Sequence, residues 1–173
     1  MNIIVISGKQ YSGKDTLAKI LLEELKGFKR AGLGDAIKIE YGKQKNLAFD
    51  EIEKNKHLYR KELINLGNWG RNKNQDYWLN KISDMNNIIV PDVRVIHEIE
   101  YFKNKGAFKI RVNSDFENRK KRGTIVDNND NTETELDEYK NWDYVIENNS
   151  SYEDFKTKSQ ELLNTLKNRY NIK

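Results

Sequence analysis

One nine-residue segment near the start of the chain constrains its fold more than any other. Residues 8–16 read Gly-Lys-Gln-Tyr-Ser-Gly-Lys-Asp-Thr, which matches the phosphate-binding pattern Gly-x-x-x-x-Gly-Lys. The apolar, β-branched run at 3–6 before it is typical of a buried parallel strand, and apolar residues at helical spacing follow it. In such a strand–loop–helix unit, backbone N–H groups and the start of the helix surround phosphate oxygens. These flanks favour a phosphate site over the alternative, a glycine-rich turn in a lysine-rich chain.

Length and composition narrow the class of protein. A chain of 173 residues is long enough to bury a sizeable core, so we expect a single domain over 1–173. Cysteine is absent, which excludes disulfides and thiolate metal sites and fits a cytoplasmic protein. The chain leads directly into a strand and has no apolar stretch near ~20 residues, so we expect neither a secretory signal nor a membrane partner. The net charge of +4 suits small polyanions and is too modest to indicate nucleic acid as a partner.

Strand and helix patterns alternate along the chain. Short apolar segments predict five strands, at 3–7, 29–33, 87–90, 108–113 and 144–147. Helical patterns predict helices at 16–28, 59–66, 77–85, 95–105 and 151–169. This alternation predicts an α/β protein of three layers, in which helices cover both faces of a mainly parallel five-stranded sheet. Ligands bind such sheets beyond the carboxyl ends of the strands, where Gly8, Asp92 and Asn113 fall.

Two polar segments do not fit this scaffold. Residues 34–80 are polar and carry scattered aromatic side chains, and we expect them to form an irregular acceptor-binding region. Residues 114–137 are highly charged and nearly lack core-forming side chains, and we expect them to form a lid. Because both segments follow strand ends, both are predicted to hang over the phosphate site.

The phosphate-binding loop supplies the first candidate site residues. We expect six residues to hold the donor phosphates: Gly8, Ser12, Gly13, Lys14, Asp15 and Thr16. The Lys14 ammonium is predicted to be exposed at the loop and to reach the β- and γ-phosphates. A hydroxyl usually stands where Asp15 does, but a carboxylate is also a hard oxygen ligand for Mg²⁺, as is the Thr16 hydroxyl. The alternative role for Asp15 is to stabilise the start of the helix.

Charged residues elsewhere complete the expected site, since phosphoryl transfer depends on positioning and charge neutralisation. Asp92 closes an apolar strand and is a candidate ligand of Mg²⁺ or proton acceptor, with capping of the next helix as its alternative. Arg94 is a candidate phosphate ligand, with an ion pair to Glu98 as the alternative. Arg119 and Arg122 are candidates for neutralising the negative charge of the transition state. The alternative is that the four consecutive cations at 119–122 form a solvated surface. The expected catalytic set is Lys14, Asp15, Asp92, Arg119 and Arg122.

The segment around residues 60–78 supplies candidates for acceptor binding. Arg60 and Arg71 are suited to hold a phosphate group by bidentate contacts. Trp69, Tyr77 and Trp78 are suited to stack on a base, and the alternative for each is packing in the core. Neither histidine of the chain has the context of a metal ligand or a catalytic triad, so both are expected to be structural.

Several sequence blocks, in order along nearly the whole chain, resemble the phage-type deoxynucleoside monophosphate kinases. The blocks are Ser-Gly-Lys-Asp-Thr at 12–16, Gly-Asp-Ala-Ile-Lys at 34–38, Arg-Lys-Glu-Leu-Ile-Asn-Leu-Gly-Asn-Trp-Gly-Arg at 60–71, Asp-Val-Arg-x-x-x-Glu at 92–98, Thr-Glu-x-x-Leu-Asp at 132–137 and Tyr-Val-Ile-Glu-Asn at 144–148. That family is related to the animal phosphomevalonate kinases, which share the Gly-Lys-Asp loop.

The resemblance implies a P-loop kinase that uses ATP and Mg²⁺ to convert a (deoxy)nucleoside monophosphate into its diphosphate, with nucleotides as its partners. It places Arg60 and Arg71 in the acceptor region and Arg119 and Arg122 in the lid. The sequence departs from the family in two places: Thr132-Glu133 replaces the usual Ser-Glu pair, and the segment 40–59 is short, so acceptor specificity is not carried over. A phage origin would place the protein in the host cytoplasm, and the sequence leaves open whether it forms a homodimer.

Other functions remain open at this point. The nearest is a kinase for another small phosphorylated acceptor such as phosphomevalonate, with the same loop and mechanism. A more distant one is a nucleotide switch or a nucleic-acid-bound ATPase that uses the cationic run 119–122. An inactive nucleotide-binding relative is the last, although the intact Gly8, Gly13 and Lys14 argue against it.

Overall fold

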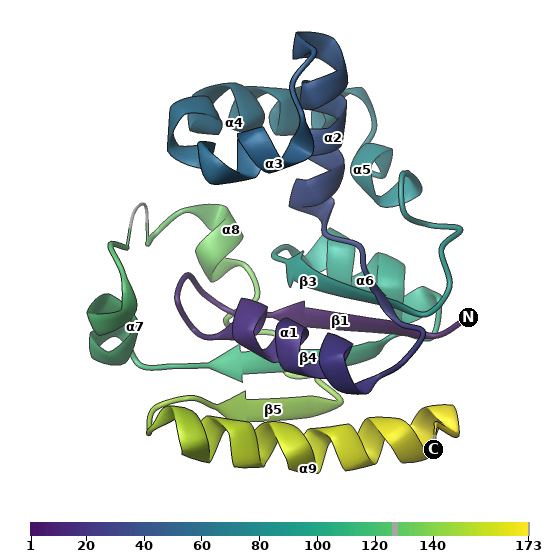
Figure 1. Ribbon diagram of the computed structural model, residues 1–173, viewed down its shortest axis with the longest axis vertical. Coiled ribbons are helices and arrows are strands. Elements are labelled where there is room, and N and C mark those ends of the chain that lie inside the picture. Colours follow the sequence, from purple (N-terminus) through teal and green to yellow (C-terminus); the bar gives the residue numbers. More distant parts are fainter. Residues whose placement is uncertain (126–127, 173) are drawn as a thin grey trace. The chain divides into compact units, whose positions relative to one another are not determined.

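In the computed structural model, which describes residues 1–125 and 128–172, five strands form one parallel sheet in the order β2-β3-β1-β4-β5 (Figure 1). The strands are β1 (Ile3–Ser7), β2 (Lys29–Arg30), β3 (Ile88–Val93), β4 (Phe108–Asn113) and β5 (Tyr144–Glu147). Every pairing is parallel, and the central strand β1 lies between β3 and β4. The predicted parallel sheet is confirmed, and the bounds of β1, β4 and β5 are those that the sequence indicated.

Helices cover both faces of this sheet. Helices α1 (Lys14–Glu24) and α9 (Tyr152–Tyr170) share an apolar core with side chains of the sheet such as Ile4 and Ile110. Helix α6 (Ile96–Asn104) lies against β1 and β4 and buries Ile99 and Phe102. The predicted three-layer arrangement is therefore confirmed. Helix α9 begins as predicted, because the Ser151 hydroxyl accepts the N–H of Asp154.

Strand β3 differs from its predicted course. The sequence placed its end at residue 90, before Pro91, yet the strand continues to Val93. Proline has no N–H to donate to the ladder, and the pairing register shifts at this point. Val5 is paired with Val90, whereas Ser7 is paired with Val93, so β3 holds one extra residue there. The irregularity accommodates Pro91 and carries Asp92 to the carboxyl end of the sheet.

Two short helices lie in the described part of the connection from β4 to β5, and residues 126–127 of the predicted lid fall outside the described residues. The helices are α7 (Phe116–Arg122) and α8 (Asn131–Thr134). The sequence predicted that this segment would nearly lack core residues, but Arg119, Glu133 and Leu136 are buried. Parts of the predicted lid are therefore packed inside the protein, and two of those three buried residues are charged.

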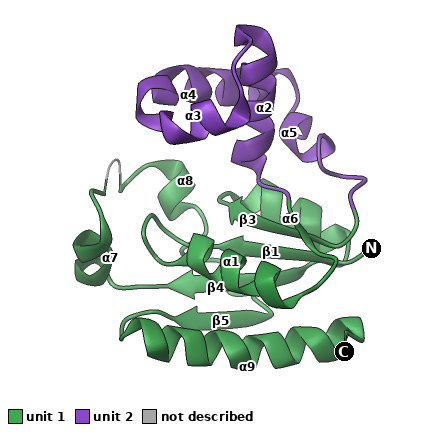
Figure 2. Ribbon diagram, in the orientation of Figure 1, with its two compact units in different colours: residues 1–30, 86–173 green, residues 31–85 purple. Residues whose placement is uncertain are grey.

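Residues 31–85 form a second compact unit, distinct from the first, which comprises residues 1–30 and 86–173 (Figure 2). The second unit contains α2 (Leu33–Lys45), α3 (Phe49–Lys54), α4 (Lys56–Lys73) and α5 (Tyr77–Asn80). The helix predicted at 59–66 lies within α4, and the one predicted from residue 77 corresponds to the shorter α5. The expectation that the rest of 34–80 would be irregular is wrong, because its many polar residues lie on exposed helix faces. The predicted strand 29–33 likewise ends at Arg30, since α2 starts at Leu33.

The indole of Trp78 closes the core of the second unit against α4. It is 2% exposed, and its Nε1–H donates a hydrogen bond to the Gly67 carbonyl at 2.9 Å. A Cβ atom added at Gly70 would lie only 2.5 Å from Trp78 Nε1. The close approach of the ring to the helix backbone therefore requires glycine at position 70.

None of the described helices is both long and apolar enough for a membrane span.

Gly70→Ala is expected to lower the free energy of unfolding by about 1–3 kcal/mol, because the new methyl group overlaps the rigid indole. Urea unfolding measures the change. Gly67→Ala is the matched control on the same helix. There the nearest atoms, Ile37 Cδ1 at 3.1 Å and an Arg71 nitrogen at 3.2 Å, are the ends of flexible side chains. The control should cost less than about 1 kcal/mol, given the better helix propensity of alanine. Equal stability of the two variants would contradict the packing argument.

Candidate active site

The loop from Gly8 to Thr16 connects the end of β1 to the first turn of α1. Gly13 precedes that helix with φ 107°, a left-handed conformation that favours glycine. The Ser12 side chain is buried, and the Asn148 amide donates to the Ser12 carbonyl at 2.7 Å. A Cβ atom at Gly13 would lie 2.3 Å from the same amide nitrogen of Asn148. The loop therefore turns tightly at Gly13 and presents the start of α1 to a phosphate group.

Lys14 is the first residue of α1 and is buried rather than exposed. Only 6% of the residue is accessible, and its Nζ lies 3.4 Å from the Lys9 carbonyl oxygen across the loop. The predicted exposure is wrong because the helix begins two residues before its expected start, and the side chain lies within the loop. Burial lowers the pKa of Lys14 below its ordinary value, and the Arg94 charge lowers it further. Nearby carboxylates counter this effect on the pKa, in the order Asp15, Glu133 and Asp92.

The three candidate magnesium ligands carry hard oxygen atoms beside Lys14. Asp15 and Thr16 lie in the first turn of α1, and Asp92 lies near the end of β3. The Asp15 side chain is 70% exposed, and its carboxylate is 3.4 Å from an Arg30 nitrogen. Within the described ranges no group of three or more His, Asp or Glu residues could hold a metal ion alone. A Mg²⁺ ion that keeps its waters and binds substrate phosphates needs only one or two protein ligands, so these residues fit it.

Arg119 and Arg122 hold the loop by its backbone. The buried Arg119 donates to the Gln10 carbonyl at 3.3 Å. Arg122 donates to the Tyr11 carbonyl at 3.2 Å and to the Asn148 carbonyl at 2.7 Å. Both arginines were predicted to act on the transferred phosphoryl group, and in this structure their guanidinium groups bind carbonyl oxygens of the loop. The structure thus brings both predicted arginines to the phosphate-binding loop.

Glu133 and Arg94 meet on the other side of the same loop. The Glu133 carboxylate accepts the Gln10 N–H at 2.8 Å and forms an ion pair with the Arg94 guanidinium. Glu98, proposed as the ion-pair partner, accepts the backbone N–H of Arg94 at 2.8 Å. The sequence blocks that carry the resemblance contained both Glu133 and Asn148, but sequence reasoning gave neither residue a role.

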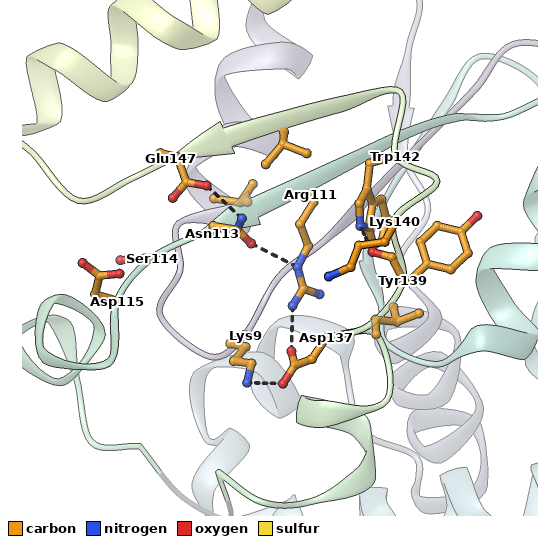
Figure 3. A pocket seen from close by; sticks show the side chains of 13 residues that line it. Lys9, Arg111, Asn113, Ser114, Asp115, Asp137, Tyr139, Lys140, Trp142 and Glu147 are labelled. Carbon is orange, nitrogen blue, oxygen red and sulfur yellow. Dashed lines mark hydrogen bonds and ion pairs between the residues drawn. The ribbon is translucent and has the colours of Figure 1, made fainter.

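A network of charged side chains links the loop to the polar face of β4 (Figure 3). The Lys9 ammonium is 2.6 Å from the Asp137 carboxylate, which also binds Arg111 at 3.1 Å. Arg111 in turn donates to the Ser7 hydroxyl at 3.1 Å. Lys9, Arg111 and Asp137 border a cavity of about 500 Å³, into which Trp142 also faces. The network fixes the first turn of the loop to β1 and β4.

The predicted acceptor residues of the second unit lie on α4 and α5. Arg60 and Trp69 are exposed on α4, and Arg71 is half-buried on the same helix. Trp69 is 46% exposed and has an edge contact with Tyr77, at 5.3 Å between ring centroids. Trp78 fills the core of the unit, so for this residue the structure selects the alternative of core packing. Arg60, Trp69 and Arg71 keep the accessibility that a ligand contact requires.

Two family models match the chain. The model of phosphomevalonate kinase matches residues 6–108, and the model of deoxynucleotide monophosphate kinase matches residues 61–159, so each covers more than half of the sequence. The first match includes the phosphate-binding loop and Asp92, and the second includes Arg94, Arg119, Arg122, Glu133 and Asn148. Residues 61–108 belong to both matches.

Solved structures with the same fold include two shikimate kinases. The enzyme from Aquifex aeolicus vf5 is 18% identical, with 98% of each chain covered and a TM-score of 0.55. The enzyme from Acinetobacter baumannii, in complex with shikimate, is 17% identical, with 97% of this chain and 93% of that chain covered and a TM-score of 0.58. The structure of TT1252 from Thermus thermophilus is 18% identical, with 95% of this chain and 97% of that chain covered and a TM-score of 0.52. At these identities the likeness shows the fold alone.

Lys14→Met should lower the rate of phosphoryl transfer by at least ~100-fold, because the variant lacks the cation that we expect to neutralise the phosphate charge. The same variant should melt at an equal or higher temperature than the parent chain at neutral pH. The folded-state pKa of Lys14 lies below its unfolded value, so burial of the charged form opposes folding below the folded pKa. This penalty disappears as the pH rises from the folded to the unfolded pKa. Near-normal turnover would contradict the assignment of the loop, and a large loss of melting temperature at neutral pH would contradict the burial argument.

Proposed function

We propose, for a chain that belongs to the P-loop kinases of the phosphomevalonate kinase and deoxynucleotide monophosphate kinase families, that the acceptor is a deoxynucleoside 5′-monophosphate. The chain is a kinase by this membership, and the proposal concerns which phosphorylated molecule receives the γ-phosphoryl group of ATP. The deoxynucleotide monophosphate kinase match supports it, because that match extends over α7, α8 and Asn148, directly after β5, and residues of these segments hold the loop. This extent over residues 61–159 is the observation that carries the proposal.

Donor binding begins at the loop. Backbone N–H groups and the start of α1 bind the phosphate oxygens of ATP, and the Lys14 ammonium neutralises charge on the β- and γ-phosphates. Asp15, Thr16 and Asp92 would hold Mg²⁺, which supplies further charge neutralisation between the phosphates when it is bound. The low accessibility of Lys14 keeps its charge poorly hydrated, so its attraction to a phosphate is stronger than in water.

Transfer then needs an acceptor oxygen in line with the γ-phosphorus. A phosphate monoester has a second pKa near 6, so about nine-tenths of it is a dianion at pH 7, and its oxygen can attack without a general base. The new bond joins that oxygen to the γ-phosphorus, the bond from the γ-phosphorus to the bridging oxygen breaks, and ADP leaves. We propose that Arg94 binds the acceptor phosphate, and that Arg119 and Arg122 contact the transferred group when ATP is bound.

We also propose that α4 supplies acceptor contacts. Arg60 and Arg71 would bind the acceptor phosphate or sugar by charge-assisted hydrogen bonds, and the exposed ring of Trp69 would stack on the base. Trp78 is not part of this proposal, because its indole is enclosed in the core of the second unit.

A second acceptor deserves a direct comparison. The phosphomevalonate kinase match covers the loop, the second unit and Asp92, so a phosphorylated isoprenoid precursor would use the same donor site and the same transfer step. The two candidates differ in one chemical respect, because only a nucleotide presents a flat base for Trp69. A preference for phosphomevalonate over every nucleotide would therefore replace the acceptor and keep the mechanism.

The deciding measurement is ADP release from Mg-ATP by the purified protein with each ribo- and deoxynucleoside monophosphate, with phosphomevalonate, and with no acceptor. We expect turnover with one or a few deoxynucleoside monophosphates. Trp69→Ala should raise the KM for that acceptor by about 5- to 100-fold, since base stacking contributes ~1–3 kcal/mol. The KM for ATP should stay unchanged. Turnover with phosphomevalonate alone would name the other acceptor. ADP release without acceptor, or stimulated by DNA, would contradict the kinase proposal.

A further inference from the structure

Glu133 is a buried carboxylate at the phosphate-binding loop. Its side chain is 2% exposed, and it lies on the short helix α8, whose start is fixed by Asp130. The Asp130 carboxylate accepts the Thr132 N–H at 2.9 Å and the Thr132 hydroxyl at 2.6 Å. A buried carboxylate is unfavourable unless charged or hydrogen-bonded partners compensate for its lost hydration. The position of Glu133 therefore depends on the groups that it binds.

Those groups come from two different strand ends. Gln10, in the loop after β1, donates its N–H to Glu133 at 2.8 Å. Arg94, directly after β3, pairs its guanidinium with the same carboxylate. Glu133 thus joins the loop that binds the donor to the arginine that follows Asp92. The Arg94 side chain is partly exposed, so it can make a further contact outside this ion pair.

The carboxylate of Glu135, which directly follows α8, makes contacts that suit a purely structural role. Glu135 accepts the Ile96 N–H at 2.7 Å and also binds the Asn131 amide. It secures the start of α6 and lies outside the loop. Glu133 differs in that one partner is a loop N–H and the other is a cation beside Lys14.

We propose that Glu133 is a positioning residue for phosphoryl transfer, which orients Arg94 toward the acceptor phosphate while it holds the loop at Gln10. The proposal rests on the proposed function, since it assigns Arg94 to the acceptor. Orientation matters because transfer requires the acceptor oxygen and the γ-phosphorus to meet in line. A guanidinium fixed on one side by Glu133 presents its remaining N–H groups in one direction.

Glu133→Gln tests the role with little change of shape. The amide oxygen of glutamine can still accept the Gln10 N–H, but its NH₂ group cannot pair with Arg94. We expect kcat/KM for the acceptor to fall by about 10- to 100-fold, with the KM for ATP within about threefold of the parent value. Glu135→Gln, at the residue that caps the end of α8, is the matched control, and both kinetic parameters should stay within about threefold of the parent values. The melting temperatures of the two variants should differ by less than about 4 °C.

A double variant separates a role through Arg94 from a general structural one. If Glu133 acts by orienting Arg94, adding Glu133→Gln to Arg94→Met should lower kcat/KM for the acceptor by less than about twofold further. Additive losses would overturn the proposal. Equal losses in the acceptor and ATP parameters, together with a lower melting temperature than that of Glu135→Gln, would also overturn it and leave a merely structural residue.

NMR of the ¹⁵N-labelled protein keeps this test independent of turnover. In Glu133→Gln, the side-chain Nε signal of Arg94 should shift or broaden, while in Glu135→Gln it should match the parent protein. An unchanged Arg94 signal would overturn the proposal even if no acceptor is found. A parent protein that binds Mg-ATP but phosphorylates none of the acceptors tested would instead contradict the proposed function.

Discussion

The backbone of the phosphate-binding loop needs hydrogen-bond partners that the loop itself cannot provide. A buried carbonyl or N–H without a hydrogen-bond partner costs free energy. In a tight turn few of these backbone groups can bind one another. Here the partners arrive from more than a hundred residues further along the chain. Arg119 binds the Gln10 carbonyl, Asn148 binds the Ser12 carbonyl, and Glu133 binds the Gln10 N–H. The connection from β4 to β5 is thereby anchored to the loop, and so is the placement of α7 and α8.

Because of this anchoring, the buried side chains of the first unit differ in polarity between the loop and the rest of the sheet. Between the sheet and helices α1 and α9 the core is apolar and includes Ile4, Ile110 and Leu163. Around the loop, charged side chains take the place of apolar ones, and Lys14, Arg119 and Glu133 are each buried. Burying such groups costs stability unless they are well paired, so this region trades stability for fixed electrostatic positions. The mean hydropathy of −0.92 reflects in part the many charges of this chain.

The sequence predicted the parts of the fold that depend on local pattern. Short apolar runs located β1, β4 and β5, and the Ser151 cap located the start of α9, because both signals act within a few residues. Other features could not be predicted from the sequence, for physical reasons. In the second unit the sequence predicted helices at 59–66 and 77–85 but missed α2 and α3, and the core of this unit depends on a long-range contact between Trp78 and the backbone of α4. The burial of Lys14 likewise arises from the tertiary wrapping of the loop, and the positions of Glu133 and Asn148 at the loop could not be read from spacing.

The second unit leaves and rejoins the sheet at neighbouring points. It follows β2 and ends just before β3, and the Lys29 N–H donates to the Asn87 carbonyl at 2.8 Å where the two strands pair. An inserted segment whose two ends lie side by side can be replaced without altering the register of its host sheet. Residues 31–85 could therefore be exchanged as one segment, while the register of the sheet and the loop at residues 8–16 stay as they are.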